Sequence, residues 1–346
     1  MENQEVRHCK AAIGVVAIGR NEGDRLRRCL DSLKERLPAA VPLIYVDSGS
    51  TDNSVAAAKA RGVSVIELDM TIPFTGARAR NEGLKRLIQQ HPQTQYVQFI
   101  DGDCELLPQW IGAATATLEK SDELAVVFGR LRERFPEASF YNQLADMEWD
   151  VPIGEADACG GISLMRVAAV QAVGGFNEAM ICGEEPELCI RLRQKGWKLR
   201  RIDTDMAIHD MDMHRFGQWW QRSVRGGWAV AEGAAMYGDT SEQYMRRQNI
   251  SGWLWGALLP MGAIALASIT HGITLTLFAA YGLLLFKIYQ YRQSQHEGRE
   301  GSEDPKKSLL YAFFCTVSKV PQAVGQGKYW INRWQQKPAT LIEYKR

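Results

Sequence analysis

Short apolar segments alternate with helical segments through the first hundred residues, and this alternation restricts the possible folds more than any other feature. Short apolar runs with β-branched residues are typical of buried strands. The predicted strands are Ala11–Ile18, Pro42–Val46, Val63–Leu68 and Tyr96–Ile100, and the predicted helices are Asn21–Leu33, Ser54–Ala60 and Ala77–Gln89. Regular alternation of this kind predicts an α/β domain with a Rossmann-like, mostly parallel sheet.

The fourth predicted strand ends at two carboxylates, Asp101 and Asp103, with only Gly102 between them. Ligands of such sheets bind at the carboxyl ends of the strands. Two acidic groups at that edge suit a hard divalent cation shared with substrate phosphates. The pair alone is a weak signal, because Asp-x-Asp also occurs in solvated turns.

The segment that follows is less regular but returns to strands. A further strand is predicted within Asp122–Arg130, a partly helical excursion at Arg132–Ile153, a strand at Ile162–Met165, a short helix at Glu187–Gly196 and a closing strand at Lys198–Ile202. With these elements, residues 1–240 are predicted to form one α/β domain.

An uncharged apolar stretch, Gln248–Phe286, divides the chain. His271-Gly272 splits it into two parts, the first long enough to span a bilayer as a helix. Arg246 and Arg247 precede it and Lys287 follows it, which favours a hairpin with both ends in the cytoplasm. We therefore expect a transmembrane helical hairpin within residues 241–292; a buried hairpin of a soluble domain, or one that only dips into a leaflet, remains the alternative. Pro260 is expected to kink its first helix.

The tail, residues 293–346, is predicted to be a linker followed by amphipathic helices in the membrane interface. Apolar and aromatic side chains alternate there with Lys319, Lys328 and Arg333. Residues 241–346 have a net charge of +7 and residues 1–240 one of −6. This asymmetry argues against nucleic acid and for an anionic surface as the partner of the tail. A helix packed on the protein or on a partner is the alternative.

The cysteines and the amino terminus give only coarse information. The seven cysteines show no CxxC pair and no zinc spacing, which favours free thiols in a reducing compartment. Met1–Lys10 is polar and does not have the pattern of a signal peptide.

Five short motifs in this order and spacing resemble the inverting glycosyltransferases of family 2, which have the GT-A fold. They are Asn21-Glu22, Val46-Asp47-Ser48-Gly49-Ser50-Thr51-Asp52, Ala79-Arg80-Asn81-Glu82-Gly83, Asp101-Gly102-Asp103 and Gly183-Glu184-Glu185-Pro186-Glu187-Leu188. The resemblance covers about residues 11–215 and is specific as a set, although no single motif is.

The resemblance implies a nucleotide-sugar donor. It places Glu22 and Asp47 near the base and ribose, and Arg80 near the base or the diphosphate. It also implies that Asp101 and Asp103 hold Mg²⁺ or Mn²⁺ against the diphosphate, with Asp103 as the direct ligand.

Other residues are assigned less specific roles. His209 is expected to complete the metal site or contact the diphosphate, and the alternative is a structural or exposed histidine. Gly160 and Gly161 are expected to allow close approach of the donor sugar or the acceptor, or else only to form a tight turn. Trp219 and Trp220 line an acceptor groove, face the membrane or pack in a core.

Glu185 is the predicted general base, which takes the proton of the acceptor. Pro186 suits the first position of a helix, so Glu185 is expected at or just before the helix start, where the dipole favours its ionised form. The family usually has Asp at this position, and Glu184 remains a second candidate. A pair that only caps the helix is the alternative.

The sequence thus predicts a membrane-anchored glycosyltransferase facing the cytoplasm. It would transfer a sugar, with inversion, to a lipid-linked or surface-glycan acceptor, as in polysaccharide biosynthesis. A nucleotidyltransferase on a similar sheet is one alternative, although Ile18-Gly19-Arg20-Asn21 is a poor phosphate loop. A catalytically inactive membrane scaffold is another, against which the complete set of acidic positions argues.

Overall fold

The computed structural model describes residues 12–296, 303–337 and 339–344. The predictions for Met1–Lys10 and Cys9, and part of the predicted linker Gln293–Lys307, lie outside these residues. The chain divides into two compact units, Met1–Asp212 and Met213–Arg346, and each is described by itself.

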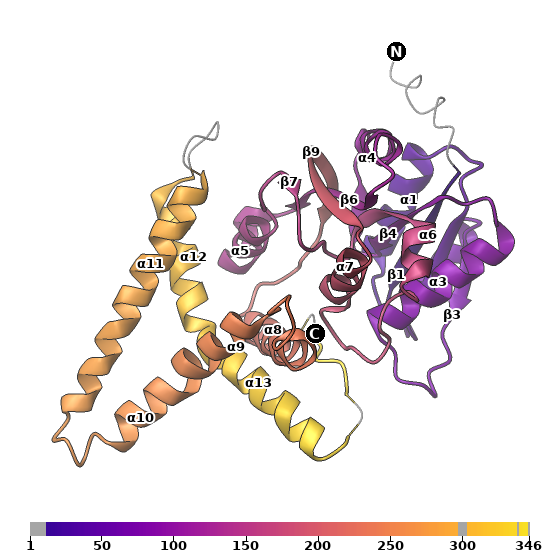
Figure 1. The fold of residues 1–346 in the computed structure, drawn as a ribbon. Coiled ribbons are helices and arrows are strands. Elements are labelled where there is room, and N and C mark those ends of the chain that lie inside the picture. The colour runs from indigo at the N-terminus through magenta and orange to yellow at the C-terminus, as the bar shows by residue number, and fades with distance from the viewer. Residues whose placement is uncertain (1–11, 297–302, 338, 345–346) are drawn as a thin grey trace. The chain divides into compact units, whose positions relative to one another are not determined.

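The first half of the sheet in unit 1 is parallel, as predicted. It consists of β1 (Ile13–Gly19), β2 (Leu43–Asp47), β3 (Ser64–Glu67) and β4 (Tyr96–Asp101), in the spatial order β3-β2-β1-β4. The connections are α1 (Asp24–Arg36), α2 (Ser54–Ala60) and α3 (Gly76–Gln90), drawn in indigo to violet in Figure 1. The predicted alternation is confirmed, with α1 beginning later than expected. The delay arises because Asn21 and Gly23 have positive φ angles of 56° and 52° and form a turn first.

The second half of the sheet is mixed, so the prediction of a mostly parallel sheet is wrong there. Its strands are β5 (Cys104–Leu106), β6 (Leu124–Glu133), β7 (Gly154–Glu155), β8 (Ser163–Arg166) and β9 (Lys198–His209). β8 pairs antiparallel with both β4 and β6, whereas β6 and β9 are parallel. Antiparallel neighbours need no helical crossover, so the strand–helix rhythm that signals a parallel sheet is missing from this part of the sequence.

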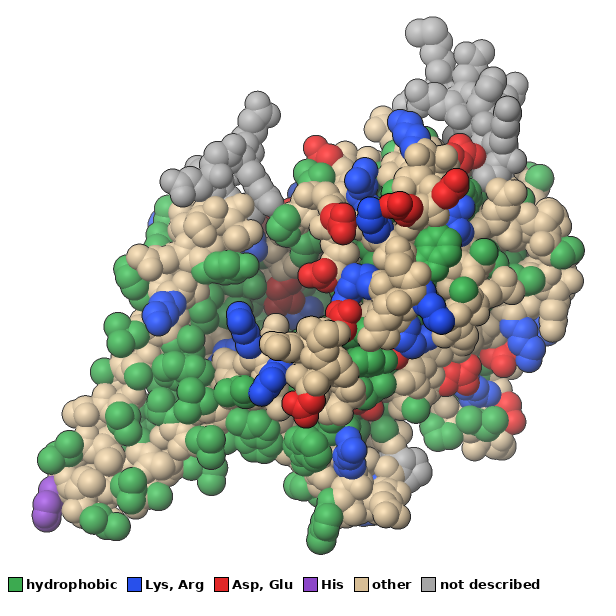
Figure 2. All heavy atoms as spheres, in the orientation of Figure 1, with side chains coloured by type: hydrophobic (Ala, Val, Ile, Leu, Met, Phe, Trp, Pro, Cys, Tyr) green, Lys and Arg blue, Asp and Glu red, His purple; other side chains and the backbone are tan. Residues whose placement is uncertain are grey.

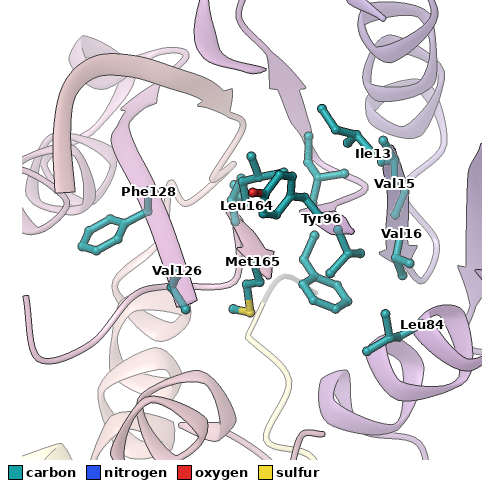
Figure 3. Close-up of a cluster of buried hydrophobic side chains, with 14 of the residues drawn as sticks. Ile13, Val15, Val16, Leu84, Tyr96, Val126, Phe128, Leu164 and Met165 are labelled. Atoms are coloured by element: carbon teal, nitrogen blue, oxygen red, sulfur yellow. The ribbon is translucent and has the colours of Figure 1, made fainter. Parts of the chain in front are cut away.

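The helices of this half are α4 (Trp110–Glu119), α5 (Phe140–Glu148), α6 (Val167–Ala172) and α7 (Glu184–Gln194). The predicted helix at Glu187–Gly196 begins three residues too late, and α4 was not predicted. Figure 3 shows the core that holds the sheet in place, with Leu84 of α3 facing Val16 of β1. Further side chains come from β4, β6 and β8, so the two halves of the sheet share one apolar core.

Unit 2 consists of helices in the described residues. They are α8 (Phe216–Tyr237), α9 (Arg246–Trp253), a π-helical segment (Leu254–Leu258), α10 (Leu259–Ala265), a 3-10 segment (Ile273–Phe278), α11 (Ala279–His296), α12 (Pro305–Val317) and α13 (Lys319–Trp334). α8 and α13 approach closely because glycines lie at their contact. A side chain at Gly227 would meet the Gln322 backbone, and one at Gly325 would meet the Val224 carbonyl.

The uncharged stretch forms a hairpin that turns at His271 and Gly272, which have φ angles of 50° and 86°. Among the described residues, one helical segment, Ile273–Gln295, has the length and apolar character needed to cross a membrane. The π-helical segment directly precedes the turn of α10 that contains Pro260. Local π geometry is one way in which a helix adjusts to the loss of the backbone hydrogen bond that proline cannot donate.

Candidate active site

Parallel pairing brings the ends of three strands to one edge of the sheet. Gly19 of β1 is in register with Asp47 of β2, and Ile18 of β1 with Asp101 of β4. The loops after these strands therefore start side by side, as the carboxyl edge of a parallel sheet requires.

Arg80 is the centre of a cluster of charged side chains at this edge. It lies on α3, where Thr75 caps the helix by accepting a hydrogen bond from the Arg78 backbone N–H. Its Nη1 lies 2.9 Å from Glu184 Oε1. Its Nη2 lies 3.0 Å from Asp101 Oδ1 and 2.9 Å from Glu185 Oε1. The structure therefore brings together four of the predicted site residues from three separate parts of the chain.

The charges in this cluster are unbalanced, with three carboxylates around one guanidinium. Burial alone would lower the pKa of Arg80, but Glu185, Asp101 and Glu184 raise it above its ordinary value. Burial raises the pKa of Glu185 to about 7, with Glu184 and Asp101 adding to this effect and Arg80 opposing it. Glu185 is therefore a carboxylate that can gain or lose a proton near neutral pH.

The start of α7 differs from the prediction. The helix begins at Glu184, after Gly183 with a φ angle of 80°, so Glu185 is its second residue and Pro186 its third. Proline is tolerated there because the N–H groups of a first helical turn have no partner within the helix. The expected effect of the helix dipole, a carboxylate held ionised, is outweighed by burial and by Glu184.

The two glutamates differ in access. The Glu184 side chain is 5% exposed, and its Oε1 lies 2.5 Å from where a side chain at Gly76 would begin. The Glu185 side chain is 15% exposed. Glu184 is thus enclosed beside Arg80, while Glu185 keeps a route to a substrate.

Gly161 lies directly over the cluster. A Cβ at this position would collide with Arg80 Nη2 and lie 3.0 Å from both Asp101 Oδ2 and Glu185 Oε1. A Cβ at Gly160 would meet nothing within 4 Å. The absence of a side chain at Gly161 is therefore a condition for the cluster, whereas Gly160 faces open space.

Asp103 has a different partner from Asp101. β5 pairs with β9 so that Cys104 is opposite His209, and Asp103 Oδ2 lies 3.3 Å from His209 Nε2. Possible ligand atoms of Asp103, Cys104 and His209 lie within 4.8 Å of one another. A carboxylate and an imidazole suit Mn²⁺ well and Mg²⁺ less well, since Mg²⁺ prefers oxygen ligands.

Cys104 completes this group but remains a thiol. Burial, together with Asp103 and Asp101, raises its pKa well above the ordinary value. Its Sγ donates a hydrogen bond to Asp103 Oδ1 over 3.3 Å. This hydrogen bond orients the Asp103 carboxylate.

Two residues beside His209 were not found from the sequence. The Trp149 ring packs edge-on against the imidazole with 4.9 Å between centroids. The carboxylate of Glu133 lies 3.7 Å from His209 Nδ1 and accepts a hydrogen bond from the Met211 backbone N–H. Glu133 ends β6, so a buried acidic residue at a strand end was the available signal.

Glu22 and Asp47 occupy different surroundings. Glu22 pairs with Arg25 at 3.0 Å, and its Cγ lies 3.3 Å from where a side chain at Gly102 would begin. It therefore lies against the glycine between the two aspartates. Asp47 is buried and accepts hydrogen bonds within its own loop, from the Tyr45 hydroxyl, the Gly49 and Ser50 N–H groups and the Ser50 hydroxyl.

The loops after β1 and β2 are joined to each other. The Asn21 N–H donates to Ser50 Oγ over 2.9 Å, and Asn21 Oδ1 accepts from the Thr51 N–H over 2.7 Å. The Ser48 N–H donates to the Gly19 carbonyl over 3.0 Å. These hydrogen bonds hold the two loops together as one wall beside the carboxyl edge of the sheet.

Two family models match the chain. Residues 15–174 match glycosyl transferase family 2, and residues 141–215 match the N-terminal domain of galactosyltransferase. The glycosyltransferase AglE of Haloferax volcanii is 22% identical over 217 residues, which are 60% of this chain and 69% of that protein.

Two further relatives extend the comparison. The pre-mycofactocin glycosyltransferase of Mycobacterium tuberculosis is 26% identical over 245 residues, 66% of this chain and 48% of that protein, so the chain spans about half the length of this relative. The mannosyltransferase PcManGT from Pyrobaculum calidifontis, solved with GDP-Man and Mn²⁺, superposes with a TM-score of 0.62 at 16% identity. That match covers 93% of this chain and 88% of PcManGT, and it is a likeness of fold.

Proposed function

We propose that this chain is a glycosyltransferase of family 2 with the GT-A fold, and that it transfers a sugar, with inversion, from a nucleoside-diphosphate donor to a lipid-linked or surface-glycan acceptor. The supporting observation is the cluster of Arg80 with Asp101, Glu184 and Glu185 beneath Gly161. It combines a cation for the diphosphate with a carboxylate that titrates near neutral pH.

Glu185 acts as the general base in this proposal. The acceptor hydroxyl attacks the anomeric carbon as its proton passes to Glu185. The bond from that carbon to the diphosphate oxygen breaks, and its electron pair stays with the diphosphate. One base is sufficient for a single displacement, which inverts the anomeric centre.

Arg80 and the metal site act on the leaving group. The guanidinium binds the diphosphate, and Asp101, Glu184 and Glu185 hold the guanidinium in position for it. Asp103 and His209 would hold a divalent cation, Mg²⁺ or Mn²⁺, and Asp101 would face the donor beside them. The bound cation supplies positive charge to the departing diphosphate. PcManGT, with GDP-Man and Mn²⁺, supports this assignment by its fold.

The donor base and ribose are assigned to the joined loops after β1 and β2, near Glu22 and Asp47. Because Asp47 accepts hydrogen bonds from the Gly49 and Ser50 N–H groups, it holds the loop in the conformation that faces the donor. Gly160 and Gly161 leave room for the donor sugar or the acceptor.

Membrane attachment supports the choice of acceptor. The segment Ile273–Gln295 has no buried residue in its apolar window. On α13, Val324, Ile331 and Trp334 form an exposed apolar stripe, opposite the face that packs on α8. Lys328 lies beside this stripe, whereas Arg333 donates a hydrogen bond to the Tyr329 hydroxyl on the face toward α8. We assign the protein to the cytoplasmic membrane, with its catalytic domain in the cytoplasm and α12 and α13 in the interface with anionic lipid.

A screen of nucleotide sugars with Mn²⁺ tests this proposal. A rise in melting temperature identifies the donor, and turnover of that donor is then measured by release of nucleoside diphosphate. Metal-dependent release that Asp103→Ala abolishes is the expected result. Release of pyrophosphate from a nucleoside triphosphate would instead identify a nucleotidyltransferase, and a folded protein without turnover of any donor would identify a scaffold.

A further inference from the structure

The apolar hairpin has an exposed surface of unusual extent. Gln248–Phe286 contains no Asp, Glu, Lys or Arg. Six large side chains along it are each more than 60% exposed: Leu258, Met261, Ile264, Ile269, Ile273 and Leu283. Figure 2 shows hydrophobic side chains gathered over α10 and α11, which Figure 1 locates. A contiguous apolar surface of this kind marks contact with a membrane or a partner.

The root of the first arm is fixed to α13. Gln326 Nε2 donates to the Asn249 carbonyl over 2.9 Å and to Asn249 Oδ1 over 2.8 Å. A side chain at Gly252 would meet Gln326, and one at Gly256 would meet the Lys319 carbonyl. Polar groups are costly in hydrocarbon, so we expect this root, residues 249–256, at the edge of the lipid. Contacts with α13 therefore hold the first arm up to about residue 258, and only the part after that residue is available to the membrane.

The free part of the first arm is short. Residues 258–270 measure about 20 Å as a helix, against about 30 Å for the hydrocarbon core of a bilayer. The first arm therefore falls short of a full span.

The apolar part of the second arm is also too short to span a bilayer, because the helix becomes polar beyond Lys287. Its apolar part, residues 273–286, measures about 24 Å, since its first six residues are 3-10 and the rest α-helical. Beyond Lys287, the helix enters a polar network with α12. The Arg292 guanidinium binds Glu303 at 2.7 Å, and Gln293 Nε2 donates to Ser308 Oγ over 2.7 Å. Although Ile273–Gln295 as a whole is long enough to span, its last third is thus occupied by protein contacts.

At the tip of the hairpin, around His271 and Gly272, threonine hydroxyls donate hydrogen bonds to backbone carbonyls. Thr270 Oγ1 donates to the Leu266 carbonyl over 2.8 Å, and Thr274 Oγ1 donates to the Ala263 carbonyl of the opposite arm over 2.8 Å. The two hydroxyls also lie 3.0 Å apart. A loop in water needs no such bonds, whereas polar groups at membrane depth must be satisfied within the protein.

We propose that the hairpin enters one leaflet from the cytoplasmic side and returns without crossing the bilayer. Its occupant is the acyl chains of that leaflet. Arg246 and Arg247 at one end and Lys287 at the other stay at the anionic headgroups. The proposal rests on the membrane attachment in the proposed function, and it is independent of the sugar chemistry.

The test places a fluorescent probe at the tip. His271→Cys in the full chain is labelled with the environment-sensitive dye NBD and reconstituted into phosphatidylcholine–phosphatidylglycerol vesicles. Asp239→Cys, at an exposed position after α8, is the aqueous control, and wild type corrects for labelling of native cysteines. Iodide, present on both sides of the vesicles, quenches probes in water, and lipids with doxyl groups on their acyl chains quench probes in the hydrocarbon.

A re-entrant hairpin predicts strong doxyl quenching at the tip and several-fold weaker iodide quenching than at the control. Iodide quenching equal to that of the control would overturn the proposal, because the tip would then lie in water on one side or the other. If the protein still floats with the vesicles, attachment stands and only the re-entrant path fails. If it does not float, the attachment itself fails. Donor turnover, measured on the same samples, reports separately on the sugar chemistry.

Discussion

Arg80 Nη2 lies 2.9 Å from Glu185 Oε1, so the proposed base is paired with the guanidinium. The pair has two consequences. It holds the carboxylate below Gly161, and it places a cation where the diphosphate of the donor is proposed to bind. When the diphosphate binds Arg80, its negative charge offsets that of the guanidinium. The effect of Arg80, which lowers the pKa of Glu185, is then weaker, so this pKa rises and Glu185 becomes a stronger base.

Turnover should depend on pH through Glu185. Its pKa is raised to about 7, chiefly by burial and next by Glu184, and the base must be ionised to act. We expect kcat to rise with pH and to level off above about pH 7. The measurement is the pH profile of kcat at saturating donor and metal. A rate that falls steadily with increasing pH over this range would contradict the role of Glu185.

Glu184→Gln should separate the two glutamates. The amide keeps an oxygen for Arg80 but removes a negative charge that raises the pKa of Glu185. We expect the rising limb of the pH profile to move to lower pH, with kcat on the plateau reduced by no more than about tenfold. A loss as large as that of Glu185→Gln, at every pH, would instead identify Glu184 as the base.

Gly161→Ala should damage the site without unfolding the protein. A Cβ there collides with Arg80 Nη2, so the cluster must shift. We expect kcat to fall by roughly tenfold to a hundredfold, because a misplacement of about 1 Å has effects of that size. Gly112→Ala, on α4 with nothing within 4 Å of the new Cβ, is the matched control and should leave kcat unchanged. Equal effects of the two substitutions would remove the steric argument.

The metal site should depend on Asp103 and His209 and not on the Cys104 thiol. We expect Asp103→Ala to abolish metal-dependent turnover and His209→Ala to raise the Mn²⁺ concentration required by roughly tenfold to a hundredfold. Cys104→Ser keeps a hydrogen-bond donor toward Asp103 and should retain the metal preference. Titration of turnover with Mn²⁺, Mg²⁺ and Zn²⁺ measures this. A changed metal preference in Cys104→Ser would show that the sulfur is a ligand.

The sequence predicted those parts of the fold that depend on local pattern. The helix Ser54–Ala60 was predicted with the bounds that the structure shows, and the four strands up to Asp101 follow from apolar runs and polar loops. β8 has the same kind of apolar run, but its antiparallel direction depends on partners that lie far away in sequence. The 22-residue helix α8 was not predicted, because Gln218, Gly227 and Gly233 take buried positions on it and interrupt the apolar helical spacing.

The site was predictable as a set of residues and not as an arrangement. Motif resemblance selected Arg80, Asp101 and Glu185, but only the packing of α3 against α7 brings residues about a hundred positions apart within hydrogen-bond distance. The resemblance placed Asp47 near the donor base and ribose, whereas the hydrogen bonds that its two oxygens accept, from the Tyr45 hydroxyl and the Ser50 N–H, became visible only in the structure.

The most direct test of the account is Glu185→Gln, measured for donor turnover and for stability at about pH 8. The account predicts a loss of kcat of about 10²–10⁴-fold, the usual contribution of a general base, with donor affinity largely retained. Because the folded state raises the pKa of Glu185, the carboxyl stabilises the fold when protonated, and this contribution is lost as pH rises toward 7. Removing the charge at pH 8 should therefore leave the melting temperature unchanged or higher. Turnover within about tenfold of wild type, in a protein of undiminished stability, would contradict the claim that Glu185 is the base.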